Sequence, residues 1–235
     1  MSDQTLSESD LLPCEDNIAP YVDPRCLELP IWTTKQDEYR LRGILDFVGQ
    51  GWRFALSRVP EEATWGLKAD QQDLLCYMGV PLKIIVVGVL KTLEIILTDD
   101  PTSASLAVGV ELLREVDVEA HEGLLWRSTV RTAEERPKQF VARAHNQGAE
   151  RIFDSFFDAR DDYTSRQRMP IATAHQLAIG DILLLDVQLR RRALAPRWSA
   201  YEPFIELRHV NLLVGQPDVE RTRRASSPDN FTWGL

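Results

Sequence analysis

The chain has 235 residues, of which 44% are hydrophobic and 27% are charged, and its formal net charge is −9. This composition is ordinary for a globular protein and excludes global disorder. No apolar run approaches the roughly 20 residues of a membrane-spanning helix, and the start of the chain lacks the basic and apolar segments of a signal peptide. We therefore expect an intracellular protein that does not contact a membrane.

The negative charge is concentrated at the start of the chain. Residues 1–38 carry nine acidic and two basic side chains, so the remainder is nearly neutral and can still present a basic groove to nucleic acid. Residues 1–37 lack apolar periodicity, which predicts an acidic, flexible N-terminal arm. Apolar residues such as Tyr21 and Trp32 leave open the alternative that this arm docks on the body or on a partner.

The next region, residues 38–79, is predicted to form a hairpin and a short helix that pack on the body. Apolar and polar residues alternate in 39–47 and again in 52–56, on either side of a glycine pair, which predicts the two strands of a hairpin. Its polar face carries Arg40, Arg42 and Arg53, and either solvent or a phosphate backbone suits them. The spacing of apolar residues in 70–78 predicts the helix, which Gly79 ends.

Three strands and a helix are predicted after this region. A long strand covers 82–97, with a bulge or sharp coil at Gly88, and a second strand covers 106–113. A third covers 124–132, and residues 139–144 extend or pair with it. Three phenylalanines within 152–163 recur at the spacing of one helical face, which predicts a core helix.

Two paired strands, Ile182–Arg190 and Phe204–Val214, are the clearest elements of the sequence. The remaining residues, 216–235, predict a flexible C-terminal tail whose tip carries Phe231, Trp233 and Leu235.

No motif in the sequence identifies a reaction. The four histidines are isolated, the three cysteines are widely spaced, and the hydrolase, P-loop and dinucleotide signatures are absent. We therefore expect reduced thiols, no metal site, no cofactor and no catalytic residues. An enzyme with an unrecognised site stays open as an alternative.

The order of elements from Val80 to Gly215 is strand, strand, strand, helix, strand, strand, which is the order of the OB-fold. The segments LAIGDILLLDVQLRRR and PFIELRHVNLLVG resemble the fourth and fifth strands of OB-folds in replication protein A and in telomere end-protection proteins. The resemblance implies a mainly β (α+β) protein in which residues 80–215 form an OB-like five-stranded barrel, with a core helix between strands three and four. A β-sandwich is the structural alternative.

If the resemblance holds, single-stranded nucleic acid lies across the barrel, with aromatic side chains stacking on bases and arginines facing phosphates. The strongest clue is the loop between the last two strands, where cations alternate with aromatic side chains; a solvated arginine turn beside a packed tryptophan is its alternative interpretation. The candidate nucleic-acid-binding residues are Trp126, Arg127, Arg131, Arg190, Arg191, Arg192, Arg197, Trp198 and Tyr201.

A second role competes with nucleic-acid binding. The barrel can instead be a protein-binding subunit of a larger assembly that does not touch nucleic acid. The acidic arm, the net acidity and the partner-binding candidates Phe231, Trp233 and Leu235 favour this role, because such segments become ordered on partner surfaces. The resemblance to telomere proteins favours a DNA-maintenance complex and the nucleus over the cytoplasm.

Overall fold

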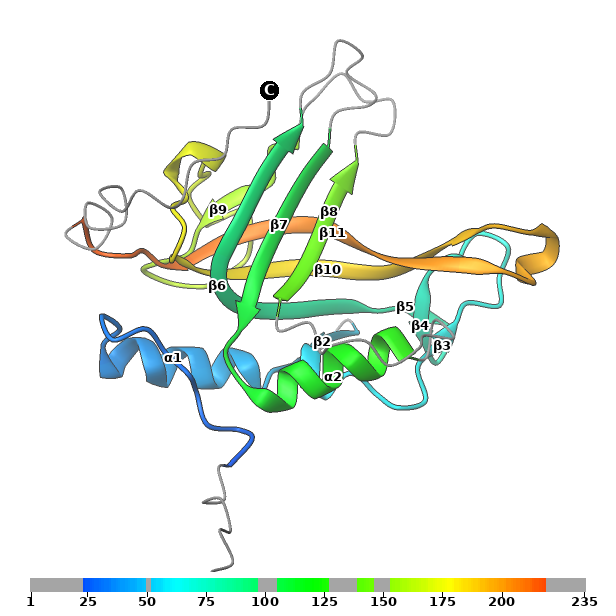
Figure 1. Ribbon diagram of the computed structural model, residues 1–235, viewed down its shortest axis with the longest axis horizontal. Helices are drawn as coiled ribbons and strands as arrows, with labels where there is room; N and C mark the ends of the chain where they lie inside the picture. Colours follow the sequence, from blue (N-terminus) through cyan, green and yellow to red (C-terminus); the bar gives the residue numbers. More distant parts are fainter. Residues whose placement is uncertain (1–22, 50–51, 97–104, 127–138, 146–152, 219–235) are drawn as a thin grey trace, which may run out of the picture.

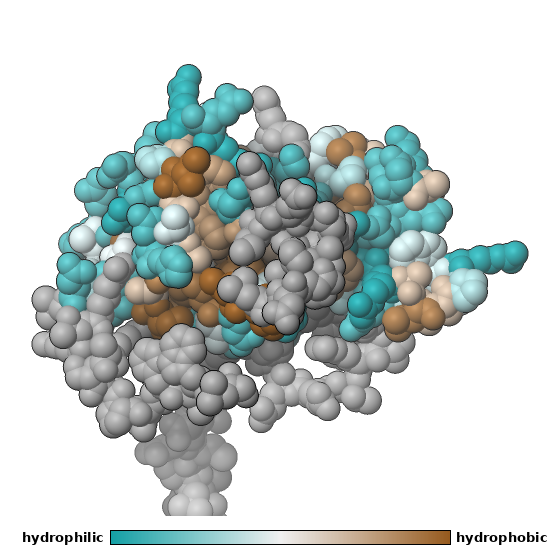
Figure 2. Space-filling view, turned by 90° about the horizontal axis from the view of Figure 1, so that it is seen from above, coloured by the Kyte–Doolittle hydropathy of each residue, from teal (hydrophilic) through white to brown (hydrophobic). Residues whose placement is uncertain are grey.

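A closed five-stranded barrel forms the centre of the computed structural model, which describes residues 23–49, 52–96, 105–126, 139–145 and 153–218 (Figure 1). The barrel strands are β6 (Lys83–Ile96), β7 (Ser105–Leu112), β8 (Gln139–His145), β10 (Ile182–Ala193) and β11 (Tyr201–Val214). The ends of β6, β7 and β8 that are uppermost in Figure 1 lie on the side seen in Figure 2.

The barrel closes in the order β6, β10, β11, β8, β7 and back to β6. Its neighbours run antiparallel, except β8 and β11, which run parallel. A meander of three strands is thus joined to a closing hairpin through one parallel pair. The prediction of a mainly β protein with an OB-like barrel is confirmed, and so are the strands predicted at 82–97, 106–113 and the two closing segments.

Strand β6 bends, and its two halves pair with different neighbouring strands. Its residues 84–89 pair with β10, whereas residues from Gly88 onward pair with β7. A Cβ atom at Gly88 would lie 2.5 Å from the carbonyl oxygen of Glu111 and 2.9 Å from the Cβ of Val110. Only glycine therefore lets the two strands approach this closely. The strand is continuous there, and its register shift lies between Leu90 and Thr92.

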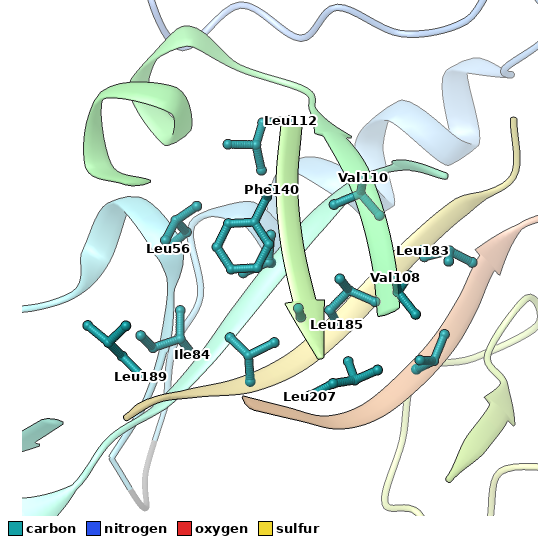
Figure 3. Close-up of a cluster of buried hydrophobic side chains, with 14 of the residues drawn as sticks. Leu56, Ile84, Val108, Val110, Leu112, Phe140, Leu183, Leu185, Leu189 and Leu207 are labelled. Atoms are coloured by element: carbon teal, nitrogen blue, oxygen red, sulfur yellow. The ribbon is translucent and has the colours of Figure 1, made fainter. Parts of the chain in front are cut away.

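The barrel is filled by side chains that alternate inward along its strands (Figure 3). They include Val108 and Val110 of β7, Phe140 of β8 and Leu185 of β10, each at most 2% exposed. The helix α2 (Glu115–Trp126) lies across the lower end of the barrel in Figure 1 and adds two side chains to this core, Val118 and Leu124.

A second apolar layer covers the outer faces of β6 and β10. It consists of the helix α1 (Lys35–Leu45), residues 159–169 and part of the N-terminal arm, which pack against Val87 and Leu184 of the barrel. The amide of Glu28 donates to the carbonyl of Leu113 at 2.9 Å. The described part of the acidic arm, from residue 23, is therefore docked on the body.

The predicted hairpin at 39–56 is wrong in its first strand, because most of that strand lies in α1. The hydroxyl of Thr34 accepts from the amide of Asp37, whose carboxylate accepts from the amide of Thr34; this capping box begins the helix. Leu41 and Leu45, one helical turn apart, are the buried residues of α1. Strand β1 (Val48–Gly49) pairs instead with the short strand β2 (Arg53–Ala55).

The short helix predicted at 70–78 is also wrong. Strand β4 (Leu75–Tyr77) pairs there with β3 (Thr64–Trp65) and β5 (Val80–Pro81) in a small separate sheet. Met78 and Gly79 both have positive φ, 50° and 75°, and together they form the tight connection between β4 and β5. Gly79, predicted to end a helix, therefore lies in the turn of a hairpin instead.

The core helix predicted at 152–163, between strands three and four, is wrong as well. The described residues from 153 contain instead the strand β9 (Phe156–Asp158), which pairs in parallel with β11. Phe156 is buried in the barrel core, whereas Phe157 packs against the outer apolar layer, so the side chains alternate as in a strand.

The helix of the barrel lies between strands two and three, not between strands three and four. The predicted strand at 124–132 begins inside α2, and its part after Trp126 lies outside the described residues. The third barrel strand is β8, the segment that was predicted only to extend or pair with it.

Candidate functional site

The structure gathers six of the predicted nucleic-acid-binding residues on the β10–β11 hairpin. They are Arg190, Arg191, Arg192, Arg197, Trp198 and Tyr201. Trp126 lies apart from them, at the end of α2. Arg127 and Arg131 lie outside the described residues, and so do Phe231, Trp233 and Leu235.

Two of the hairpin arginines are neutralised by carboxylates. Arg190 donates from Nε to Asp73 at 2.9 Å and from a terminal nitrogen to Glu206 at 3.0 Å. Arg192 pairs with Glu202 on the facing strand, where both side chains are exposed. These guanidiniums would have to give up carboxylate partners before they could bind phosphates.

The third arginine, Arg191, is enclosed by three aromatic rings. Its guanidinium carbon lies 4.8 Å from the ring centre of Trp65, 4.4 Å from that of Trp198 and 4.9 Å from that of Tyr201. Its Nε donates to the carbonyl of Gln72 at 2.7 Å. Burial lowers the pKa of this guanidinium from its ordinary value, and the ring faces supply the compensating cation–π attraction. We call Arg191, Trp65, Trp198 and Tyr201 the arginine cage.

The loop between the strands adopts an unfavourable backbone to build this cage. Arg197 and Trp198 both have positive φ, 57° and 58°, a conformation that costs about 1–2 kcal/mol for each residue other than glycine. In return, the indole Nε1 of Trp198 donates to the side chain of Gln72 at 2.8 Å. The cage therefore fastens the hairpin to the turn before β4, and Arg191 occupies one face of each of the three rings.

The outer face of β7 and β8 provides no stacking platform. Its described positions carry Ser105, Ala107, Gly109 and Glu111 on β7 and Gln139, Val141 and Arg143 on β8, with no aromatic side chain among them. Gln139 donates across Gly109 to the hydroxyl of Thr92 at 3.0 Å. Because sequence-tolerant binding of single strands relies on aromatic stacking, this face does not favour it.

An apolar hollow of about 400 Å³ opens at the end of the barrel seen in Figure 2, where apolar side chains are exposed among hydrophilic ones. Exposed isoleucines border it: Ile95, Ile96 and Ile171 have 42%, 52% and 79% of their surfaces exposed. We call it the mouth pocket; its lining residues are Ile95, Ile96, Ser105, Leu106, Ala144, Phe153, Asp154, Phe156, Ile171, Ala172, Thr173, Ala174 and His175.

The sequence prediction missed the mouth pocket, because its wall comes from segments that are far apart in the chain. The only available signal was the cluster of phenylalanines at 153–157, which was assigned to a core helix. Mouths of β-barrels with an apolar lining and few polar groups are common ligand sites.

A polar cluster lies between the barrel and its outer layer. Asp186 of β10 is only 2% exposed and accepts from Arg53 of β2 at 3.0 Å and from Arg166 at 3.2 Å. Arg53 also donates to the hydroxyl of Tyr163, and burial raises the pKa of that phenol to about 12. Arg53 was predicted to face solvent or a phosphate backbone; it is instead committed to this cluster.

His209 belongs to the same cluster. It lies opposite Asp186 in the β10–β11 ladder. Burial, reinforced by the charge of Arg166, lowers the pKa of this imidazole to about 4, so the ring is neutral near pH 7.

The described residues contain no group of three or more His, Cys, Asp or Glu side chains arranged to hold a metal ion. In the same part of the chain, no helix is both long and apolar enough to cross a membrane. Comparisons with protein-family models, curated proteins and solved structures found no match.

Proposed function

We propose that this chain is a non-enzymatic, OB-like barrel module that binds a partner protein by taking an apolar side chain of the partner into the mouth pocket. The observation that carries the proposal is the hollow itself, an apolar cavity of about 400 Å³ open to solvent at the end of the barrel.

The exposed rim favours a protein over a small molecule or a nucleic acid. Ile95, Ile96 and Ile171 extend the apolar surface from the hollow onto the outside of the molecule, where a partner larger than the hollow would cover them. The described lining is mostly apolar and holds no lysine or arginine side chain for phosphate groups. Burying one large apolar side chain contributes about 1.5–3 kcal/mol, so the anchor would need support from contacts on this rim.

Filling the pocket should weaken partner binding. Ala174 is a half-buried residue of the pocket lining at the edge of the barrel core, so the change Ala174→Trp should block the hollow. Peptides with an apolar anchor, selected from a displayed random library against the wild-type chain, should bind the variant at least about tenfold more weakly, a loss of about 1.4 kcal/mol. Fluorescence anisotropy of labelled peptides would measure the difference.

The matched control is Ala193→Trp, which adds the same side chain at an exposed position of the β10–β11 hairpin. It should bind the selected peptides as the wild type does. If the library yields no apolar consensus, or if its peptides bind the Ala174→Trp variant unchanged, the proposal is wrong.

Single-stranded nucleic acid is the second candidate, because exposed Arg197 flanks the arginine cage and the pair of Arg192 with Glu202 is itself exposed. With Arg190 and Arg191 engaged internally, we expect a fluorescent single-stranded oligonucleotide to bind only in the non-specific range, with a Kd of about 1–100 µM that weakens as salt is raised. Much tighter binding that is weakened by both Arg191→Ala and Trp198→Ala would instead support nucleic-acid recognition through the cage.

A further inference from the structure

The mouth pocket and the polar cluster share one stretch of chain. Strand β9 directs Phe156 to the pocket and Phe157 to the other side, where its ring centre lies 5.9 Å from that of His209. The chain returns beside β9, because the amide of Ala172 donates to the carbonyl of Phe156 at 3.0 Å. We call residues 156–172 the covering loop; its two ends form part of the pocket wall and its middle covers the polar cluster.

Apolar, hydrogen-bonded and charged contacts hold down the middle of the covering loop. Met169 and Ala159 pack in the outer apolar layer, and the amide of Ala159 donates to the carbonyl of Leu212 at 2.9 Å. Arg166 binds Asp186, and Tyr163 accepts from Arg53 while its ring packs on that guanidinium at 5.5 Å. The pairing of β9 with β11 and a hydrogen bond from Arg40 of α1 to the carbonyl of Arg160 also hold the loop. The electrostatic balance around one carboxylate is therefore the part of the attachment that a proton can change.

His209 lies beside this carboxylate, and its ring is neutral near pH 7. Arg53 of β2, Arg166 of the covering loop and Arg208 of its own strand act against its protonation, and Asp186 acts in favour of it. Asp186 is already shared by Arg53 and Arg166, and Arg208 is paired with Glu206 at 3.3 Å. The buried Nδ1 of His209 finds no hydrogen-bond partner among the described residues. An added proton would therefore place a third cation, besides Arg53 and Arg166, beside one shared carboxylate.

We propose that the covering loop is an acid-sensitive wall of the mouth pocket, released when His209 takes up a proton. The inference rests on the proposed function of the pocket and adds its regulation: a partner bound at neutral pH would be released in acid. When the loop lifts, the short pairing of β9 with β11 breaks, and Phe156, Ile171 and Ala172 leave the pocket wall together, because the chain joins them to the segment over His209.

The sign of the effect follows from linkage. The pKa of His209 is lowered in the closed form, to about 4 from an ordinary value of 6.5, so the open form binds the proton more tightly. The closed loop is fully favoured above pH 6.5 and loses this advantage as the pH falls toward 4. The open fraction should rise by up to about tenfold per pH unit, and by about 15-fold from pH 6.5 to pH 5, because half of the open form is already protonated at His209 at pH 6.5.

Hydrogen exchange of the full chain tests the loop directly. We expect the protection of amides in residues 156–172, corrected for the intrinsic rate at each pH, to fall by about 15-fold from pH 6.5 to pH 5 in the wild type. In His209→Gln the fall should be less than about threefold, because the titrating group is gone. His209→Phe provides a second neutral variant, and His175→Gln, which removes a titratable group of the pocket lining, should behave as the wild type.

An equal loss of protection in His209→Gln and wild type, or no loss in the wild type, would overturn the inference. The affinity of the selected apolar peptides at pH 7.5 and pH 5 provides a separate readout. If no peptide binds at pH 7.5, the proposed function fails while the exchange data still decide whether His209 controls the loop. If peptides bind equally at both pH values although the loop opens, the link between loop and pocket is wrong.

Discussion

Replacing Asp186 with alanine should lower the free energy of unfolding by about 3 kcal/mol. The change leaves the guanidinium of Arg53, whose side chain is only 25% exposed, without the carboxylate that compensates its burial. It also frees Arg166, which ties the covering loop to the barrel. We place the loss at the lower end of the range for broken buried pairs, because both arginines keep some contact with solvent. Urea unfolding followed by tryptophan fluorescence would measure it.

Two variants make the test specific. Glu202→Ala removes the carboxylate of an exposed pair with Arg192, and its cost should stay below about 1 kcal/mol. The double change Arg53→Met with Asp186→Leu replaces the pair by apolar side chains and should recover much of the stability lost in Asp186→Ala. If Asp186→Ala costs no more than Glu202→Ala, then the polar cluster does not hold the outer layer in place.

Truncating Phe140 to alanine should cost about 3–5 kcal/mol of unfolding free energy. The ring is 2% exposed and lies in the barrel core, with its centre 4.8 Å from that of the His121 ring of α2. The neighbouring strands are fixed by their ladders, so the space left by the ring cannot collapse fully. The same urea titration would report the loss.

The next residue in the same strand provides the control. Val141 is only partly buried, on the outer face of β8, and Val141→Ala should cost well under half as much as Phe140→Ala. Because side chains alternate along a strand, the two variants report opposite faces of β8. Equal losses, or a larger loss for Val141→Ala, would contradict the register of the barrel.

The barrel strands could be predicted from the sequence because each is a run of apolar, β-branched residues bounded by turn residues. Residues near Gly88 illustrate this, since no helix periodicity competes with the strand pattern there. The segment with Phe153, Phe156 and Phe157 fits a helical stripe and a strand equally well, and its pairing with β11 decided between them. For Leu41 and Leu45 the four-residue spacing, with the Thr34 capping box, was a readable helix signal that the alternation of neighbouring residues obscured.

Only those parts of the candidate site whose residues are close together in the sequence could be predicted. The sequence identified the cations and rings of the closing hairpin, but Trp65 and Gln72, which complete the arginine cage, belong to a distant segment around the small sheet. Because of these contacts, Arg191 is a cation with partners inside the protein and not a cation free to bind phosphate. Likewise Asp186 sits in the apolar strand pattern, and only the fold brings Arg53 and Tyr163 to it.

The bend of β6 at Gly88 also affects how the chain folds. Its first half pairs with β10, so Val89 lies opposite Ile182, a residue made long after β6, β7 and β8 have been synthesised. Such non-local pairing requires a large loop to close, and the entropy lost on closure is offset only after the strands have paired. Barrels of this kind fold in milliseconds to seconds. During synthesis the early meander would wait with an unpaired edge and an uncovered apolar face, and the last-made hairpin would complete the structure.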